Sequence, residues 1–233
     1  MMKRQIIALG GGGFSMEPDN LALDRYILSQ SDKQEPRICF IPTASGDKPD
    51  YIRRFYEAFN RLSCKPSHLS LFEPTFQDLH AFVMKQDILY VGGGSTRNLL
   101  ALWQEWKLDT IIAEAYQNGI ILTGLSAGAN CWFEEGLTDP LNGSLYAIEG
   151  LGILSGSICP HFNGEIKRRP AYLSAIEQGR IMEGYGVDDS AALHFVDEQL
   201  IHAVCSRKGA AAYKINRQGA GTVEERISAA YLN

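Results

Sequence analysis

Ile120-Ile121-Leu122-Thr123-Gly124-Leu125-Ser126-Ala127-Gly128-Ala129-Asn130 is the stretch that decides the fold. It begins as an apolar run typical of a buried strand, passes through Gly-x-Ser-x-Gly and ends in a segment that favours a helix. This order is that of a nucleophile elbow, in which small residues flank a serine on a tight strand-to-helix turn. The pattern predicts a serine hydrolase with Ser126 as nucleophile and the amide of Ala127 available to an oxyanion. The alternative is a plain strand-to-helix turn built from small residues.

Size and composition indicate an ordinary α/β protein. The 233 residues fit a single domain spanning 1–233, and 45% of them are hydrophobic and 21% charged. The net charge of −5, without a basic run, argues against nucleic acid as a partner. No apolar stretch reaches the roughly 18 residues that a membrane span needs, and residues 1–5 do not look like a signal peptide. We therefore expect a cytoplasmic protein without a membrane partner, and a homodimer is left open.

The five cysteines are widely spaced, and none forms a Cys-x-x-Cys pair. Neither a disulfide framework nor a zinc site is implied, so no metal is expected. Packing in the core is the favoured interpretation of these side chains.

Short apolar runs alternate with helical patterns along the first half of the chain. This βαβα order predicts a mostly parallel, doubly wound sheet flanked by helices. The expected strands are Gln5–Leu9, Arg37–Ile41, His68–Leu71, Asp87–Val91 and Ile120–Thr123. The expected helices are 20–30, 50–61, 76–85, 96–106 and 108–118.

The pattern changes after about Asp139. A helix is expected near Lys167–Gln178, followed by short alternating runs at Ala191–Phe195, Leu200–Cys205 and Ala211–Ile215. We interpret these three runs as antiparallel strands at the edge of the same sheet.

Two glycine runs follow predicted strands, as the elbow does. Ligands of an open parallel sheet bind beyond the carboxyl ends of its strands, so Gly10–Gly13 and Gly92–Gly94 are expected beside Ser126. Gly93 or Gly94 could supply the second amide of an oxyanion hole. Neither run matches a dinucleotide or phosphate-binding motif, so no nucleotide cofactor is expected. The alternative for the first run is a tight turn without a catalytic part.

The serine needs a general base, and His161 is the best placed of five histidines. It lies in Cys159-Pro160-His161-Phe162-Asn163, where a predicted strand ends in a loop after the elbow. Serine before histidine is also the order of α/β hydrolases. The acid that would orient the imidazole is either Asp139 or a member of the Asp188-Asp189 pair. Spacing alone does not choose between them.

At this point the sequence resembles the peptidase E family of serine peptidases, the aspartyl dipeptidases, to which cyanophycinase is related. The matching motifs are Gly92-Gly93-Gly94, residues 124–130, Pro160-His161-Phe162 and Gly186-Val187-Asp188-Asp189. They occur in the family order and extend over roughly residues 5–215.

The resemblance implies a class I glutamine-amidotransferase-like α/β fold and a metal-free catalytic triad of serine, histidine and an acid. Ser126 would be the nucleophile, His161 the base and Asp189 the favoured acid, with Asp139 as the alternative. Asp189 stands where the family has glutamate. Arg169 would bind the substrate's aspartyl carboxylate, because the family places an arginine after the histidine loop. A solvated basic turn is the alternative for Arg169.

We therefore expect a serine peptidase for short peptides, with N-terminal aspartate as the preferred residue. The sequence departs from the family pattern at residues 163–166 and at Gly94-Ser95. Both departures bear on that specificity, and neither affects the nucleophile. The alternatives are a cyanophycinase-like hydrolase of β-aspartyl or isopeptide bonds and a non-catalytic binding module on the same scaffold.

Overall fold

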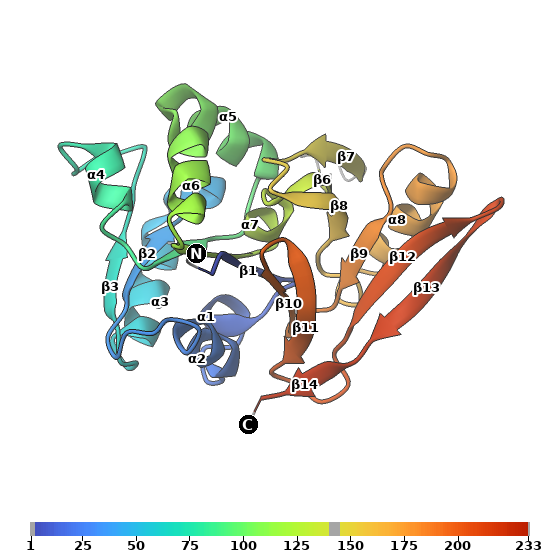
Figure 1. The fold of residues 1–233 in the computed structure, drawn as a ribbon, viewed down its shortest axis with the longest axis horizontal. Coiled ribbons are helices and arrows are strands. Elements are labelled where there is room, and N and C mark those ends of the chain that lie inside the picture. The colour runs from blue at the N-terminus through green and yellow to red at the C-terminus, as the bar shows by residue number, and fades with distance from the viewer. Residues whose placement is uncertain (1–2, 140–144, 233) are drawn as a thin grey trace.

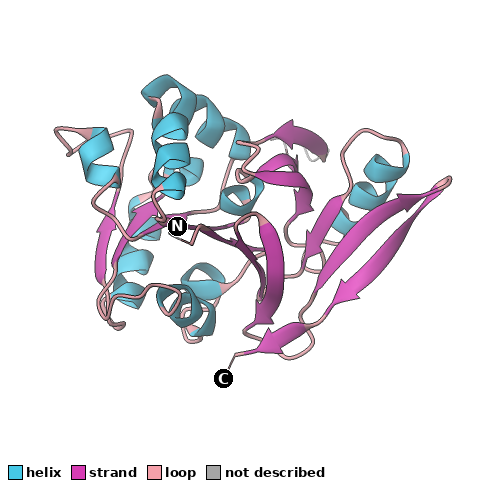
Figure 2. Cartoon of the chain, viewed as in Figure 1, coloured by secondary structure: helices cyan, strands magenta, loops and turns pink. Residues whose placement is uncertain are grey.

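Two β-sheets form the framework of the computed structural model, which describes residues 3–139 and 145–232. In Figure 1 the first sheet runs through the middle of the molecule between two groups of helices, and the second forms one end (Figures 1 and 2). The first sheet has, in spatial order, β14 (Ala229–Tyr231), β11 (Gln199–Cys205), β10 (Ala191–Val196), β1 (Gln5–Leu9), β5 (Ile121–Leu125), β4 (Ile88–Val91), β2 (Arg37–Ile41) and β3 (Lys65–His68). The second has β13 (Gly221–Ile227), β12 (Ala212–Gln218), β9 (Gly184–Val187), β8 (Leu154–Cys159), β6 (Phe133–Thr138) and β7 (Tyr146–Glu149).

The first sheet confirms the expected mixed α/β architecture. Strands β1, β5, β4, β2 and β3 are parallel, and β1 also pairs antiparallel with β10. Every residue of β1, β4 and β5 is buried, as expected for parallel strands covered on both faces. The carboxyl ends of these strands therefore meet at one edge of the sheet.

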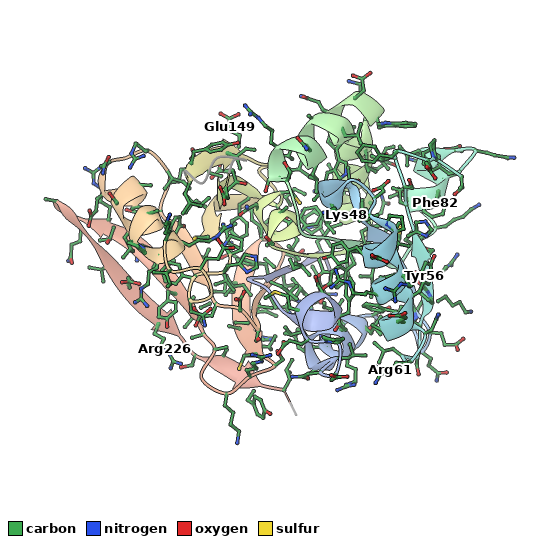
Figure 3. The ribbon with its side chains drawn as sticks, turned by 180° about the vertical axis from the view of Figure 1, so that it is seen from behind. Lys48, Tyr56, Arg61, Phe82, Glu149 and Arg226 are labelled. Carbon is green, nitrogen blue, oxygen red and sulfur yellow. The ribbon has the colours of Figure 1, made fainter. Side chains whose placement is uncertain are left out.

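The helices connect the strands and cover both faces. They are α1 (Gly13–Met16), α2 (Ala22–Leu28), η1 (Thr43–Ser45, a 3₁₀ helix), α3 (Pro49–Phe59), α4 (Leu79–Val83), α5 (Thr96–Trp106), α6 (Leu108–Gln117), α7 (Ala127–Asn130) and α8 (Arg168–Glu177). Figure 1 places α1, α2 and α3 on one side of the first sheet and α5, α6 and α7 on the other. Seen from behind, Lys48, Tyr56 and Arg61 follow α3 from its start to just beyond its end (Figure 3).

Two of the predicted elements were wrong in position. The strand expected at His68–Leu71 is β3, at Lys65–His68, because its pairing with β2 starts at Lys65. Leu69 and Leu71 are buried, but they reach the core from the loop after the strand. The helix expected at 76–85 is only the short α4, which begins after Asp78, whose carboxylate accepts the amide of Ala81 at 2.9 Å.

The second sheet was not predicted. The runs at Ala191–Phe195 and Leu200–Cys205 are antiparallel strands of the first sheet, as expected. The run at Ala211–Ile215 instead belongs to β12, which pairs with β9 and β13. Alternation of apolar and polar residues identifies a strand, but the long-range contacts that choose its partner leave no local pattern.

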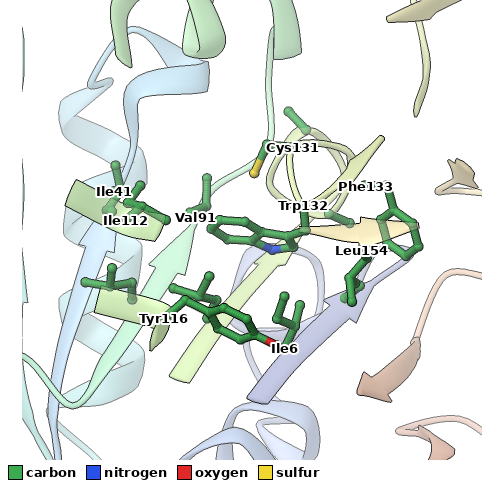
Figure 4. Close-up of a cluster of buried hydrophobic side chains, with 14 of the residues drawn as sticks. Ile6, Ile41, Val91, Ile112, Tyr116, Cys131, Trp132, Phe133 and Leu154 are labelled. Atoms are coloured by element: carbon green, nitrogen blue, oxygen red, sulfur yellow. The ribbon is translucent and has the colours of Figure 1, made fainter. Parts of the chain in front are cut away.

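One buried hydrophobic cluster joins the two sheets. Ile6 of β1 and Val91 of β4 share it with Phe133 of β6 and Leu154 of β8, and Trp132 lies between these groups (Figure 4). Burial of such large side chains provides most of the driving force for folding. In the part of the chain that the structure describes, no helix is long and apolar enough to cross a bilayer.

Candidate active site

Ser126 lies on a sharp turn between β5 and α7. Its backbone has φ 55° and ψ −113°, a conformation that residues other than glycine rarely adopt. A Cβ atom on Gly124 would collide with the carbonyl of Gly128, and one on Gly128 would collide with the carbonyl of Val91, so both positions must stay small. The Ser126 side chain is partly exposed and does not cap α7. The turn thus has the backbone of a nucleophile elbow.

The end of β1 anchors the backbones of both Ser126 and His161. The carbonyl of Leu9 accepts the amide of Ser126 at 3.3 Å, and the next carbonyl, that of Gly10, accepts the amide of His161 at 3.1 Å. Two consecutive peptide groups therefore set the spacing of the two backbones. This arrangement places Gly10, the first residue of the glycine run, at the site.

His161 pairs with Asp189. Its Nδ1 lies 2.6 Å from Oδ1 of Asp189, and the two side chains are only 13% and 25% exposed. Since the carboxylate accepts the hydrogen bond, Nδ1 carries the proton, and Nε2 of the neutral ring keeps its lone pair. An imidazole in this tautomer can take a proton from a hydroxyl.

The loop after His161 surrounds the Asp189 carboxylate. The side-chain oxygen of Asn163 accepts the Asp189 amide at 2.9 Å. A Cβ atom on Gly164 would collide with Oδ2 of Asp189, and one on Gly11 would collide with Oδ1. Sequence reasoning missed Asn163, Gly164 and Gly11 as supports of the site. Their signal was the departure of residues 163–166 from the family pattern, together with the first glycine run.

The other candidate acids lie elsewhere. Asp139 is exposed just beyond β6, a strand of the second sheet. Asp188 is buried and accepts the amide of Ala211 at 3.0 Å, and burial raises the pKa of its carboxyl. The structure therefore brings Asp189 to His161 by direct contact and places Asp139 on a different strand end.

The three predicted oxyanion donors differ in their surroundings. The Gly93 amide donates to the hydroxyl of Tyr51 at 3.2 Å, and a Cβ atom on Gly93 would lie 3.4 Å from that of Ser126. Gly94 has φ 142° because it passes close to the carbonyl of Ala44. Among the described residues, the amides of Gly94 and Ala127 meet no hydrogen-bond acceptor. These two amides are therefore more available to an oxyanion than the amide of Gly93.

Arg169 is already engaged. Its guanidinium lies 2.9 Å from the Glu224 carboxylate on β13 and stacks over the rings of Phe162 and Tyr213, at 5.2 and 5.1 Å. The side chain is still 45% exposed. A ligand carboxylate at Arg169 would have to share it with Glu224 or displace it.

A buried carboxyl group lies beneath the glycine turn. Asp24 of α2 is fully buried, its oxygens are close to the position a Gly13 Cβ would take, and the hydroxyl of Tyr90 is close to the same point. Burial raises the pKa of Asp24 to about 7. The neighbouring carboxylate of Glu17 is also buried, but it bonds Ser206 at 2.7 Å and Arg207 at 2.6 Å.

The described residues include no group of three or more His, Cys, Asp or Glu side chains placed to hold a metal ion. Cys39, Cys131, Cys159 and Cys205 are buried, and Cys64 is partly so; none of the five is in a disulfide. Burial raises the pKa of the Cys131 and Cys159 thiols, so these side chains behave as packing residues.

Comparison with known proteins gives relatives over nearly the whole chain. A sequence model of peptidase family S51 matches residues 6–203. The chain is 60% identical over 212 residues to the uncharacterized peptidase YgaJ of Bacillus subtilis (strain 168), covering 91% of this chain and 92% of that protein. It is 23% identical over 187 residues to the uncharacterized peptidase Lin0382 of Listeria innocua serovar 6a, covering 77% and 90%.

A solved structure shares the fold. The crystal structure of a peptidase from an acI-B1 Actinobacterium superposes with a TM-score of 0.71 at 20% identity, covering 98% of this chain and 95% of that one.

Proposed function

The chain belongs to peptidase family S51, and from this membership we propose a serine peptidase that cleaves short peptides after an N-terminal aspartate. Family membership makes the protein a peptidase. The serine mechanism, the catalytic residues and the preference for aspartate are our proposal.

The contact between His161 and Asp189 beside the Ser126 turn is the observation that carries the proposal. The 2.6 Å hydrogen bond selects the tautomer that leaves Nε2 free, and consecutive carbonyls of β1 and the residue after it anchor the serine and the histidine. This is the combination that nucleophilic acyl transfer requires: a hydroxyl, a base and a group that orients the base.

In the proposed reaction Ser126 Oγ attacks the scissile carbonyl carbon as its proton passes to Nε2 of His161. The negative charge of Asp189 stabilises the imidazolium. The amide of Ala127, with that of Gly94 or Gly93, stabilises the oxyanion. The C–N bond then breaks as His161 returns the proton to the leaving amine, and an acyl-enzyme remains. Water, deprotonated by His161, attacks the ester and releases Ser126.

The preference for aspartate follows the resemblance in sequence, with Arg169 as the proposed carboxylate ligand. Because Arg169 is paired with Glu224, this part of the proposal requires the pair to open or to share its guanidinium. Replacement of Glu224 by glutamine would then lower the KM for aspartyl peptides.

A dipeptide panel tests the proposal. Wild type and Ser126→Ala are compared on Asp-Leu, isoAsp-Leu, Glu-Leu, Asn-Leu and Ala-Leu. We expect wild type to cleave Asp-Leu preferentially and Ser126→Ala to be inactive at unchanged thermal stability. Preference for isoAsp-Leu would replace the substrate with an isopeptide, as in cyanophycinase. Equal turnover by Ser126→Ala, or no fluorophosphonate labelling of Ser126 in wild type, would refute the serine mechanism.

A further inference from the structure

A second arginine is linked to the glycine run beside the elbow through one aromatic residue, Tyr51. Arg54 is the central residue of α3, which follows β2 and begins at the same edge of the sheet as Ser126. Its guanidinium carbon lies 5.0 Å from the centre of the Tyr51 ring, and its Nη1 donates to the carbonyl of Ser15 in α1 at 3.0 Å. The residue therefore bridges α1 and α3, which lie side by side in Figure 1.

Tyr51 connects Arg54 to the catalytic edge. Its hydroxyl accepts the amide of Gly93, and a Cβ atom on Gly93 would come into van der Waals contact with that of Ser126. One phenol ring and one glycine thus separate the guanidinium from the nucleophile. An extended dipeptide spans about 7 Å. The Tyr51 ring is itself buried, so of these two side chains only the exposed Arg54 is available to a peptide held at Ser126.

Most of the hydrogen-bond donors of Arg54 have no partner within the described protein. A guanidinium has five N–H donors, and the structure gives Arg54 one protein acceptor, a neutral carbonyl. No carboxylate of the described residues lies within 4.0 Å of it. Its neighbour Arg53 is different, because it pairs with Glu57 at 2.6 Å and Asp50 at 3.4 Å.

The acidic groups around α1 do not cancel this charge. Glu17 is paired with Arg207. Asp24 is buried beneath α1 without a hydrogen-bond partner among the described side chains, and its burial opposes ionisation. Asp50 and Glu57 face Arg53. Arg54 is consequently an exposed cation that contacts one carbonyl and the Tyr51 ring and keeps donors for a ligand.

We propose that Arg54 binds a carboxylate of the peptide substrate and so determines specificity for short acidic peptides. This inference rests on the proposed peptidase function and names a carboxylate ligand distinct from Arg169. The carboxylate is either the free C-terminus of the peptide or the side chain of its first residue. Both have the same chemistry, and a bidentate guanidinium contact suits either.

Binding measurements on the catalytically silent Ser126→Ala protein test the inference without relying on turnover. The probes are Asp-Leu, Asp-Leu amide (no C-terminal carboxylate) and Asn-Leu (no side-chain carboxylate), titrated by calorimetry. Adding Arg54→Gln should raise the Kd of Asp-Leu about 10- to 100-fold, the loss expected for a charge-assisted hydrogen bond. Arg54→Lys should give a smaller loss, because the charge remains and the fork is lost.

Each of the two analogues lacks one of the carboxylates of Asp-Leu, and together they identify the carboxylate that Arg54 binds. The peptide that lacks the group read by Arg54 should bind equally well with and without the Arg54→Gln substitution, whereas the other should lose affinity. Arg53→Gln is the matched control on the same helix and should leave every Kd unchanged. Arg169→Gln tests the other proposed carboxylate ligand. Its result is independent of the result for Arg54 and reports on Arg169, Glu224 and their surroundings.

An unchanged Kd for Asp-Leu in Arg54→Gln would overturn the inference, as would equal losses for all three peptides or no binding to the Ser126→Ala protein. The proposed function fails separately, when wild type binds Asp-Leu but does not cleave it. In that case the effect of Arg54→Gln on Kd still decides the role of Arg54.

Discussion

Nδ1 of His161 and Oδ1 of Asp189 lie 2.6 Å apart although the residues are 28 positions apart in the chain. They meet directly over the backbone of Gly11, where a Cβ atom would collide with the carboxylate and come within 3.0 Å of the imidazole ring. A glycine in the turn after the first strand is therefore what allows the base and its acid to approach each other.

Replacing each candidate acid in turn should show which of the two, Asp189 or Asp139, acts with His161. Asp189→Asn removes the charge and favours the wrong imidazole tautomer, so kcat should fall about 10³- to 10⁴-fold. Asp139→Asn is the control, and because Asp139 is exposed beyond β6 its kcat should match wild type. The two variants are compared on the best peptide of the panel. A larger loss of kcat in Asp139→Asn than in Asp189→Asn would identify Asp139 as the acid.

Gly164→Ala should disable the site while leaving the fold intact. The new methyl group would occupy the space of Oδ2 of Asp189, the flexible end of a side chain, so the carboxylate should turn away and release His161. We expect kcat to fall, by no more than in Asp189→Asn, with little change in melting temperature. Gly221→Ala, where a Cβ atom meets nothing within 4 Å, should leave both quantities unchanged. Wild-type activity in Gly164→Ala would show that the Asp189 carboxylate keeps its contact with His161 in spite of the added methyl group.

Ser126→Gly should be inactive but more stable than Ser126→Ala. The backbone at Ser126 has φ 55°, which glycine adopts without strain and alanine does not. Relief of such strain is worth about 1–2 kcal/mol in the free energy of unfolding. Urea denaturation of the two inactive variants measures the difference. Equal or reversed stabilities would mean that the turn stores no strain.

His194 should make stability depend on pH. It is fully buried, Nε2 donates to Oε1 of Gln5 at 3.1 Å, and Nδ1 accepts the Tyr26 hydroxyl at 2.6 Å. Burial lowers its pKa from 6.5 to about 4. Between these values the unfolded chain binds a proton that the folded protein does not, so stability should fall as the pH drops from about 6.5 to 4.

This contribution is measured by subtraction. The free energy of unfolding is determined by urea titration at about pH 4.5 and about pH 7.5 for wild type and His194→Gln. The difference between the two proteins should shrink by a few kcal/mol at most on going to the lower pH. His202→Gln, at the exposed neighbour that contacts the same Tyr26 hydroxyl, should keep most of the wild-type dependence, because burial lowers the pKa of His194 more than the charge of His202 does. If the stability difference between wild type and His194→Gln were the same at both pH values, His194 would not be the group that makes stability depend on pH.

Asp24 should act in the opposite direction. Its pKa is raised by burial from 3.8 to about 7, so the folded protein keeps a proton that the unfolded chain loses. Stability from this group should therefore fall as the pH rises from about 4 to 7. In the same urea titrations, the stability of Asp24→Asn relative to wild type should increase as the pH rises from about 4 to 7. Asp50→Asn, at an exposed carboxylate, should show no such gain. A gain with falling pH would mean that Asp24 is ionised in the folded state.

The sequence alone determined most segments of the parallel half of the fold and the nature of the elbow turn. Residues 120–130 carry the elbow because a buried strand, two small flanking residues and a helix former must be consecutive in the chain to make that turn. Cys159–Asn163 indicated the histidine loop for a similar reason, since the strand and the loop that follows are local. Such features depend on neighbours in the chain and are visible there.

Tertiary structure decided the rest, because it depends on residues that are distant in sequence. It assigned β12 to a second sheet, brought Asp189 rather than Asp139 to His161, and paired Arg169 with Glu224. It also left Arg54 without a carboxylate partner among the described residues, beside Tyr51, while Arg53 took both nearby carboxylates. Two adjacent arginines, or two aspartates in similar loops, look alike in a sequence. Which of them reaches the site is set by helix orientation and by the packing of glycine turns against distant strands.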